Sequence, residues 1–348
     1  MTTTSTDTLA DLWYTRCPVP TASGLAFSQG WLGERAQALG LTLGVLQDAP
    51  AHIARHHYDH ALPGLVREGG NVPAIVARAN GAPTWLIGLT WIDERQLIVS
   101  RADEPVTAAT LAGRRIAVPG WAAERHASHQ RAMALAGFES VLRHAGLGLD
   151  AVQVVDVPVG ATVPPGKLRA GRPGTGWMAL AAVAEGRADA AYVKGSGGLA
   201  AARAAGLVAA IEIDALPERR LRVNNGTPRP LTVHDELLQH RPEWAVAFLQ
   251  ESLRAARWAR EHTADVRAIL EREAGGDAAE VREAYRDGFH AGFAPDLDAD
   301  RLALLQVQAD FLHRHGFTGH ALRVDEWVAA GPLAQALRDD SGTPLRTP

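Results

Sequence analysis

The stretch MALAAVAEGRADAAYV (Met178–Val193) joins a helix pattern to a strand pattern. Its first half is helical in character up to Glu185, and Gly186 is the kind of residue that ends a helix. Ala188–Val193 is then a short apolar run, typical of a buried strand. Because a helix followed directly by a buried strand is the repeating unit of α/β proteins, this stretch predicts that fold class.

The same alternation extends in both directions along the chain. Further helical patterns lie at Ala123–His144 and Leu199–Ala205, and the chain is almost purely helical after about Asp235. The other predicted strands are Leu41–Leu46, Trp85–Thr90, Gln96–Ser100, Arg115–Val118, Val152–Val157, Val208–Ile213 and Pro230–Val233. Alternating strands and helices predict largely parallel sheets. The Pro/Gly-rich stretch Pro158–Gly176 is expected to be a mobile loop.

Composition indicates a folded protein of ordinary polarity. The chain has 348 residues, of which 47% are hydrophobic and 21% charged, which excludes a disordered chain and favours two lobes or domains. It carries 35 Lys and Arg against 39 Asp and Glu, a net charge of −4. We therefore expect no nucleic-acid partner. The apolar runs are too short to span a bilayer, so no membrane insertion is expected, and the N-terminal residues lack the apolar core of a secretory signal, which predicts a cytoplasmic location.

The single cysteine, Cys17, stands directly before a proline in YTRCPVPT. One cysteine excludes an internal disulfide and a multi-cysteine metal site. Pro18 keeps Cys17 out of helical geometry, and the neighbouring Arg16 would favour the thiolate. Cys17 is therefore a candidate functional thiol, although a lone cysteine is more often a small buried hydrophobe.

Histidines gather just before a glycine pair. His52, His56 and His60 are spaced at i, i+4 and i+8, so a continuous helix would place them along one face. Such a face can bind a transition metal, but no HExxH motif or second cluster completes a coordination shell. A solvated or partly buried histidine face is the favoured interpretation, and no metal is expected.

The segment Arg67-Glu68-Gly69-Gly70-Asn71 suits an anion. Successive glycines let backbone N–H groups converge on an oxyanion, and Arg67 offers a planar bidentate fork. An ordinary helix C-cap at Gly69 beside an exposed arginine explains the same residues equally well. Further along, Asn224-Asn225-Gly226 is interpreted as a turn and nothing more.

Two stretches resemble a known architecture. TAATLAGRRIAVPG (Thr107–Gly120) resembles the segment by which periplasmic-binding-protein-like chains enter their second lobe, and Glu185–Val193 resembles a later strand of that lobe. Arg222–His234 would be the return crossover. The resemblance implies an α/β, type II periplasmic-binding-protein-like fold of two lobes with a ligand cleft between them. Residues 1–117 plus 232–348 would form the first, discontinuous lobe, and residues 118–231 the second.

The first 75 residues resemble the bacterial 2'-hydroxybiphenyl-2-sulfinate desulfinase family. The shared motifs are the Cys-Pro-Val-Pro turn at Cys17–Pro20, the pair His57-Tyr58, Arg67, the pair Gly69-Gly70, and Pro73. The resemblance implies a catalytic set of Cys17, His57 and Arg67, with Arg67, Gly69 and Gly70 binding the substrate. Cys17 would be either the nucleophile at sulfur or the proton donor to the departing carbon. No metal or organic cofactor would be needed.

The leading hypothesis is therefore a desulfinase-like hydrolase that cleaves the C–S bond of an organic sulfinate and releases sulfite. An aromatic sulfinate is the favoured substrate. The alternative is a substrate-binding protein of an ABC transporter for sulfonate- or nitrate-like anions, and a third hypothesis is a ligand-sensing module. If the protein is a desulfinase, its expected partner is a small-molecule organosulfur anion. Tyr192–Gly198 is small and polar where the biphenyl enzyme is bulkier, so the sequence specifies neither the carbon skeleton nor an oligomeric state.

Overall fold

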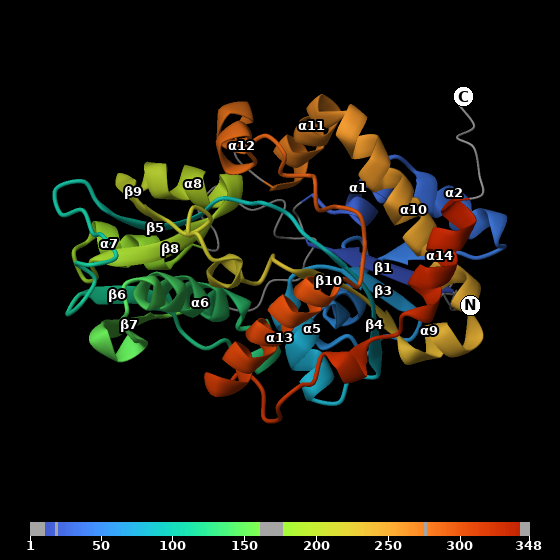
Figure 1. Cartoon of the computed structure of the whole chain (residues 1–348), viewed down its shortest axis with the longest axis horizontal. Helices are drawn as coiled ribbons and strands as arrows, with labels where there is room; N and C mark the ends of the chain where they lie inside the picture. The colour runs from blue at the N-terminus through green and yellow to red at the C-terminus, as the bar shows by residue number, and fades with distance from the viewer. Residues whose placement is uncertain (1–10, 18–19, 161–176, 275–276, 342–348) are drawn as a thin grey trace, which may run out of the picture.

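The computed structural model describes residues 11–17, 20–160, 177–274 and 277–341. Two five-stranded sheets with helices around them form two lobes, side by side along the long axis of the molecule (Figure 1). The two predicted α/β lobes are confirmed. Most of the stretch Pro158–Gly176, expected to be a loop, lies outside the described residues.

The first sheet has the strand order β2-β1-β3-β10-β4. Its strands are β1 (Leu12–Arg16), β2 (Leu43–Val45), β3 (Leu65–Glu68), β4 (Thr84–Thr90) and β10 (Arg229–His234). β1 is parallel to both β2 and β3, whereas β10 is antiparallel to β3 and β4. The sequence did not predict β1 and β3, which are the two strands that carry the candidate site.

The second sheet has the strand order β7-β6-β8-β5-β9. Its strands are β5 (Gln96–Arg101), β6 (Arg115–Pro119), β7 (Gln153–Val157), β8 (Ala190–Lys194) and β9 (Leu207–Glu212). β6 is parallel to β7 and β8, and β5 is antiparallel to β8 and β9. Each sheet thus has one reversed strand, so the prediction of largely parallel sheets holds for the other four strands only.

The reversed strands are the ones that follow the crossings between the lobes. The chain leaves the first sheet after β4 and enters the second at β5, through residues 91–95, and it returns between β9 and β10. The predicted boundary after residue 117 is therefore wrong. β5 belongs to the second sheet because its backbone hydrogen-bonds to β8 on one side and β9 on the other.

Helices cover both faces of each sheet. On β5, Leu97 and Val99 point into the core shared with α7 (Ala179–Ala184) and α8 (Gly195–Ala204). Ile98 points into the core shared with α6 (His129–His144), as the period-2 alternation of a strand requires. The helices of the second lobe are α6, α7 and α8. Those that begin in the first lobe or in the C-terminal region are α1 (Ala22–Ser28), α2 (Trp31–Ala38), α3 (Ala51–Ala54), α4 (His56–Asp59), α5 (Asn71–Ala79), α9 (Asp235–His240), α10 (Pro242–Glu261), α11 (Thr263–Ala274), α12 (Ala278–Ala284), α13 (Ala299–Arg314) and α14 (Gly331–Ser341).

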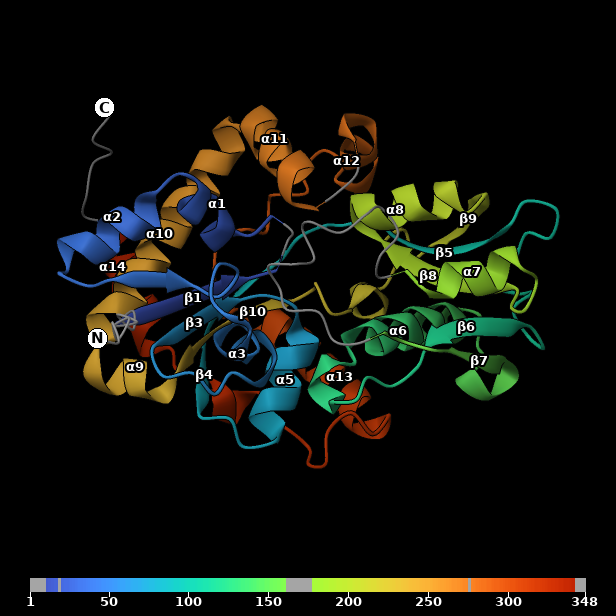
Figure 2. The ribbon, with the colours of Figure 1, turned by 180° about the vertical axis from the view of Figure 1, so that it is seen from behind.

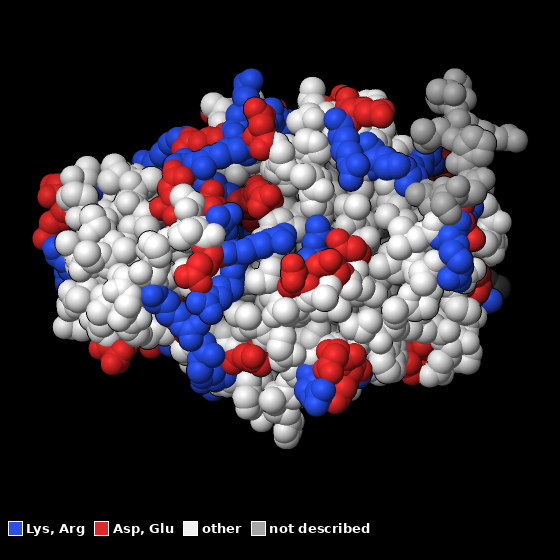
Figure 3. Space-filling view, in the orientation of Figure 1, with Lys and Arg blue, Asp and Glu red and all other residues white. Residues whose placement is uncertain are grey.

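The C-terminal helices connect the two lobes. α10 packs on α1 and α14 of the first lobe, whereas α12 packs on α8 of the second, so the chain from α10 to α12 bridges them (Figure 2). None of the described helices combines the length and the apolar character that crossing a membrane requires. On the face drawn in Figure 3, basic and acidic side chains are intermixed along the middle of the molecule.

Candidate active site

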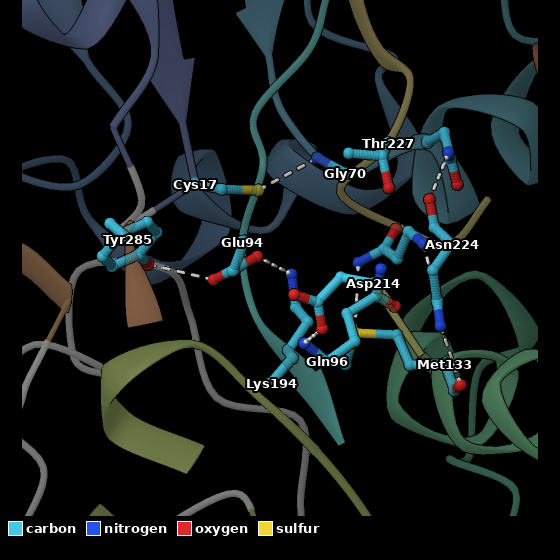
Figure 4. Close-up of polar contacts among 12 residues, drawn as sticks. Cys17, Gly70, Glu94, Gln96, Met133, Lys194, Asp214, Asn224, Thr227 and Tyr285 are labelled. Atoms are coloured by element: carbon cyan, nitrogen blue, oxygen red, sulfur yellow. Dashed lines mark hydrogen bonds and ion pairs between the residues drawn. The ribbon is translucent and has the colours of Figure 1, made fainter. Parts of the chain in front are cut away.

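Cys17 and Gly70 lie at the carboxyl ends of two adjacent parallel strands. Cys17 directly follows β1, and Gly70 lies two residues after the end of β3. The backbone N–H of Cys17 donates to the carbonyl of Glu68 (3.3 Å), and the N–H of Gly70 donates to Sγ of Cys17 (3.1 Å; Figure 4). Ligands of open α/β sheets bind at this edge, where the carboxyl ends of parallel strands meet. The two parallel strands therefore bring together residues from separate motifs.

Arg67 lies in β3 and is 1% exposed. Its Nε donates to the carbonyl of His57 (3.2 Å) and its Nη1 to the carbonyl of Gly70 (3.0 Å). Nη2 has no hydrogen-bond partner within the described part of the chain. The predicted bidentate fork is thus corrected: the backbone uses two of the three guanidinium nitrogens, and Nη2 is left to meet a ligand.

The charge of Arg67 is coupled to that of Cys17. Burial lowers the pKa of Arg67 from its usual value, Cys17 opposes this shift, and Arg229 adds to it. Arg16 was expected to be the cation beside the thiol, but its guanidinium pairs with Glu273 and lies over the ring of Phe27. Arg67, and not Arg16, is the arginine of these two that lines the pocket with Cys17.

His57 lies in the short helix α4 and is held by a hydroxyl of β1. Its Nδ1 is 2.8 Å from Oγ1 of Thr15, and that oxygen accepts a hydrogen bond from Nε2 of Gln47 (3.2 Å). Burial lowers the pKa of His57 well below its usual value, and the charges of Arg67 and two neighbouring histidines lower it further. His57 is therefore neutral near pH 7, with its ring fixed by the hydrogen bond to Thr15.

The two glycines of the predicted anion site have different roles. The N–H of Gly69 donates to the carbonyl of Pro230 (3.4 Å), and a Cβ at this position would lie 2.8 Å from Cζ of Arg67. Gly69 is absent from the residues that line the pocket described below. Gly69 as a substrate-binding residue stays a prediction. It makes room for the guanidinium of Arg67, and Gly70 supplies the N–H at the site.

The histidines are not spaced along one helix. α3 ends at Ala54 and a separate helix, α4, ends at Asp59, after which His60 adopts a left-handed backbone conformation (φ 57°). Because the helix is interrupted, His52, His56 and His60 do not share the face that the i, i+4, i+8 spacing predicted. Across the described ranges, no group of three or more His, Cys, Asp or Glu side chains is placed to bind a metal ion.

A pocket of about 170 Å³ joins these residues to the second lobe. From the first sheet and its loops it is lined by Cys17, His57, Tyr58, Arg67, Gly70 and Pro73. From the second lobe it is lined by His129, Met133 and Lys194, and from the return segment by Asn225 and Gly226, with Arg229 at the start of β10 in the first sheet. The ring of His129, at the start of α6, stacks on Tyr58 (centroids 6.1 Å apart). The pocket therefore lies between the lobes, where the sequence analysis placed the ligand cleft.

Asn225 lines the pocket, although the local sequence Asn224-Asn225-Gly226 predicts only a turn. Its Oδ1 accepts a hydrogen bond from the N–H of Val72 (2.9 Å) and its carbonyl accepts one from the N–H of Asn71 (2.7 Å). A Cβ at Gly70 would lie 2.4 Å from the same Oδ1. Asn225 thus caps the start of α5 and packs against Gly70, a contact between distant segments that no local motif indicates.

Lys194 and Arg229 add positive charge to the pocket. Nζ of Lys194 pairs with Oε2 of Glu94 (2.6 Å), and the hydroxyl of Tyr285 donates to Oε1 of Glu94 (3.0 Å; Figure 4). Burial raises the pKa of Glu94, but the charge and hydrogen bond of Lys194 outweigh it and the pKa lies below its usual value. With Arg67, three cations line the pocket and one of them is neutralised by a carboxylate, an arrangement that favours anions.

Comparisons with known proteins find similar sequences and structures over most of the chain. No family model matches the chain. The chain is 29% identical over 94% of its length to the 2'-hydroxybiphenyl-2-sulfinate desulfinase of Rhodococcus erythropolis, and equally to that of Rhodococcus qingshengii, and the match covers 93% of each relative.

Several solved structures share the fold of this chain. The crystal structure of the desulfurization enzyme DSZB matches with a TM-score of 0.72 and 26% identity, over 94% of this chain and 99% of that one. A cysteine-to-serine mutant of DSZB in complex with biphenyl-2-sulfinic acid matches with a TM-score of 0.69 and 24% identity over the same shares. The periplasmic aliphatic sulphonate binding protein SsuA from Escherichia coli matches with a TM-score of 0.64 and 17% identity, over 91% of each chain. The chain is thus similar to 2'-hydroxybiphenyl-2-sulfinate desulfinase over nearly its whole length and has the fold of the periplasmic sulfonate-binding proteins, as its sequence predicted.

Proposed function

We propose that this protein is a desulfinase, a hydrolase that cleaves the C–S bond of an aromatic sulfinate and releases sulfite. The observation that carries the proposal is the position of Cys17, whose Sγ lies 3.1 Å from the N–H of Gly70 in a pocket that Arg67 and His57 also line. The chain around this pocket is similar over 94% of its length to an enzyme named for that substrate.

The sulfinate group binds to the first-lobe side of the pocket. Nη2 of Arg67 has no partner within the described part of the chain, and the N–H of Gly70 points at the sulfur of Cys17. Donors fixed in a buried site stabilise the charge of an oxyanion more strongly than donors in water do. A sulfinate held by both donors has its sulfur atom beside Cys17.

Two routes lead from this complex to products. In the first, the thiolate of Cys17 attacks the sulfinate sulfur, the aryl carbon leaves and takes up a proton, and water then releases hydrogen sulfite from the cysteine. In the second, the thiol of Cys17 protonates the aryl carbon, sulfur dioxide leaves, and water converts it to hydrogen sulfite. Both routes consume one water and give one arene and one hydrogen sulfite. They differ in whether a bond forms between Cys17 and the substrate sulfur.

His57 acts on the proton of Cys17 in either route. A neutral imidazole can accept a proton from the thiol and return it, and the hydrogen bond to Thr15 (2.8 Å) holds the ring in one orientation. The structure has no hydrogen bond between His57 and Cys17 among its described residues, so the proton passes through substrate or water. The cytoplasmic location stays a prediction of the sequence.

Sulfite release by wild type and Cys17→Ser tests this function. We expect wild type to release sulfite from benzenesulfinate and biphenyl-2-sulfinate, and Cys17→Ser to keep the wild-type melting temperature and release none above the uncatalysed rate. A folded Cys17→Ser protein with sulfite release within tenfold of wild type would remove Cys17 from the mechanism.

The alternative, a sulfonate-binding protein, gives a different result in the same assay. The SsuA-like structures share the fold, and Arg67 and Gly70 would serve a bound sulfonate as well. If sulfonates and sulfinates raise the melting temperature but wild type releases no sulfite from any of them, the pocket binds without chemistry.

A further inference from the structure

We propose that the pocket contains a second anion subsite, formed by Arg229 and Lys194 around Gly226, and that the substrate is an aryl sulfinate that also carries a carboxylate. The inference rests on the proposed function for the sulfinate end and adds the chemistry of the other end.

Arg229 is a buried cation that donates no hydrogen bond to any of the described residues. It lies at the first residue of β10, is 1% exposed and lines the same pocket as Cys17. Its Nε and Nη1 make no hydrogen bond, and its guanidinium makes no ion pair, with any described residue. A buried guanidinium with unpaired donors is costly, so an acceptor that enters the pocket is bound strongly there.

Lys194 reaches the same place from the other lobe. A Cβ at Gly226 would lie 3.1 Å from Nζ of Lys194 and 3.3 Å from Nη2 of Arg229, so both cations approach a point that residue 226 leaves free of side chain. Oε2 of Glu94 lies 3.5 Å from that point. Glu94 is already engaged by Lys194 and by Tyr285. Its charge also acts on Arg229, but no described residue accepts a hydrogen bond from Nε or Nη1 of that guanidinium.

The second subsite adjoins the donors that face Cys17 and lies on the neighbouring strand. Nη2 of Arg67 and the N–H of Gly70 lie at the end of β3, whereas Arg229 belongs to the neighbouring strand β10. A carboxylate suits this second place because its two oxygens match a planar guanidinium and its charge balances it. A hydroxyl or a plain aromatic edge would leave the charge of Arg229 unpaired.

Matched substrates measure the subsite directly. The probes are the ortho, meta and para carboxybenzenesulfinates and the corresponding carboxamides, which keep the shape and lose the charge. A charge-assisted hydrogen bond is worth about 1.5–3 kcal/mol, so we expect wild type to prefer at least one carboxylate over its carboxamide by about 10-fold or more in kcat/KM for sulfite release. A ratio within twofold for all three isomers would overturn the subsite.

Two variants assign the preference to these residues. Arg229→Gln should reduce the carboxylate-to-carboxamide ratio to about one, and Gly226→Ala, whose new methyl group intrudes between the two cations, should reduce it several-fold. Arg220→Gln is the matched control, because Arg220 is exposed and pairs with Glu218 outside the pocket, and its ratio should equal that of wild type.

If Arg229→Gln lowers both rates by the same factor, Arg229 contacts the sulfinate itself and the inference is wrong. If Arg229→Gln does not fold, the wild-type ratios and Gly226→Ala decide.

Binding separates a failure of the subsite from a failure of the proposed function. Carboxybenzenesulfonates and their carboxamides cannot lose sulfite by desulfination, so calorimetric titration measures their affinity alone. Tighter binding of a carboxylate in wild type, lost in Arg229→Gln, supports the subsite even if no sulfinate is ever cleaved. Equal affinities for carboxylates and carboxamides would contradict the subsite even if desulfination is active.

Discussion

At the scale of single residues, Arg67 combines a structural task with a binding task. Its Nε and Nη1 hold the carbonyls of His57 and Gly70, and only Nη2 is left for a substrate. A lysine side chain has a single nitrogen, so it cannot hold these carbonyls and also bind the substrate. We expect Arg67→Lys to lower kcat/KM for an aryl sulfinate by about 100-fold, an effect of the size seen when a preorganised donor is lost. Steady-state kinetics with Arg55→Lys, an exposed control, measures the effect. A loss of less than threefold would show that position 67 needs only a positive charge.

Thr15 is a positioning residue for His57. Removing its hydroxyl in Thr15→Val leaves Nδ1 of His57 without its partner at 2.8 Å, and the ring is then free to turn. We expect kcat for sulfite release to fall about tenfold with little change in KM, because the sulfinate donors are untouched. Thr15→Ser keeps a hydroxyl and should restore most of the activity. Equal losses in the Val and Ser variants would mean that the side chain matters for packing alone.

At the scale of secondary-structure elements, the start of α5 is fixed by the return segment between the lobes. Gly70 precedes α5, and a methyl group there would lie 2.4 Å from the Oδ1 of Asn225 that accepts from Val72. The backbone of Gly70 (φ −53°) is open to alanine, so the cost of Gly70→Ala is steric. We expect a loss of about 1–3 kcal/mol in the free energy of unfolding, with reduced sulfite release.

The control for this variant is Gly33→Ala. Gly33 lies in α2 with nothing within 4 Å of a Cβ, so alanine should leave stability unchanged or raise it by up to about 1 kcal/mol. Urea denaturation of both variants makes the comparison. If Gly70→Ala is as stable and active as wild type, Asn225 does not constrain the site.

The sequence predicted the elements that look apolar and missed those that hold the site. Trp85–Thr90 and Ala188–Val193 agree with β4 and β8 to within two residues, because both are apolar runs. β1 and β3 were not predicted because they are short and contain buried charged or hydroxyl side chains such as Thr15 and Arg67. Such side chains are tolerated inside a strand because residues far away in the sequence contact them. Cys17 and Arg67 were candidates from their own motifs, whereas His57 could be chosen only through the family resemblance.

Long-range contacts account for the remaining differences. Asn225 meets α5 across more than 150 residues of chain, and Arg229 gains its place in the pocket from the pairing of β10 with β3 and β4. No local pattern encodes such pairings. The continuous helix that would align the three histidines does not form for a similar reason, since the tertiary structure ends α4 with a left-handed residue.

At the scale of the whole molecule, buried histidines make stability depend on pH. Burial lowers the pKa values of His57 and His60 well below normal and that of His129 to about 4. The unfolded chain takes up protons at these residues as the pH falls through about 6.5, and the folded protein does not, so the unfolded state gains stability. The contribution of these three histidines to the free energy of unfolding is complete above pH 6.5. It is lost as the pH falls toward their folded-state pKa values.

We therefore expect the free energy of unfolding to decrease between pH 7 and pH 5, by up to about 1.4 kcal/mol per pH unit for each of the three histidines. Urea denaturation across this range measures the slope. His129→Gln removes one titrating group and should have a shallower slope than wild type. If the urea concentration at the unfolding midpoint does not change between pH 7 and pH 5, the three rings take up protons in the folded protein as readily as in the unfolded chain.

The central claim is that the pocket between the two lobes cleaves a C–S bond at Cys17. Its most direct test is to quantify both products of one reaction, with wild type and Cys17→Ser incubated in parallel with benzenesulfinate. We predict that wild type forms sulfite and benzene in equal amounts and that the folded variant forms neither. Sulfite without an equal amount of benzene, or equal yields from Cys17→Ser, would contradict the account.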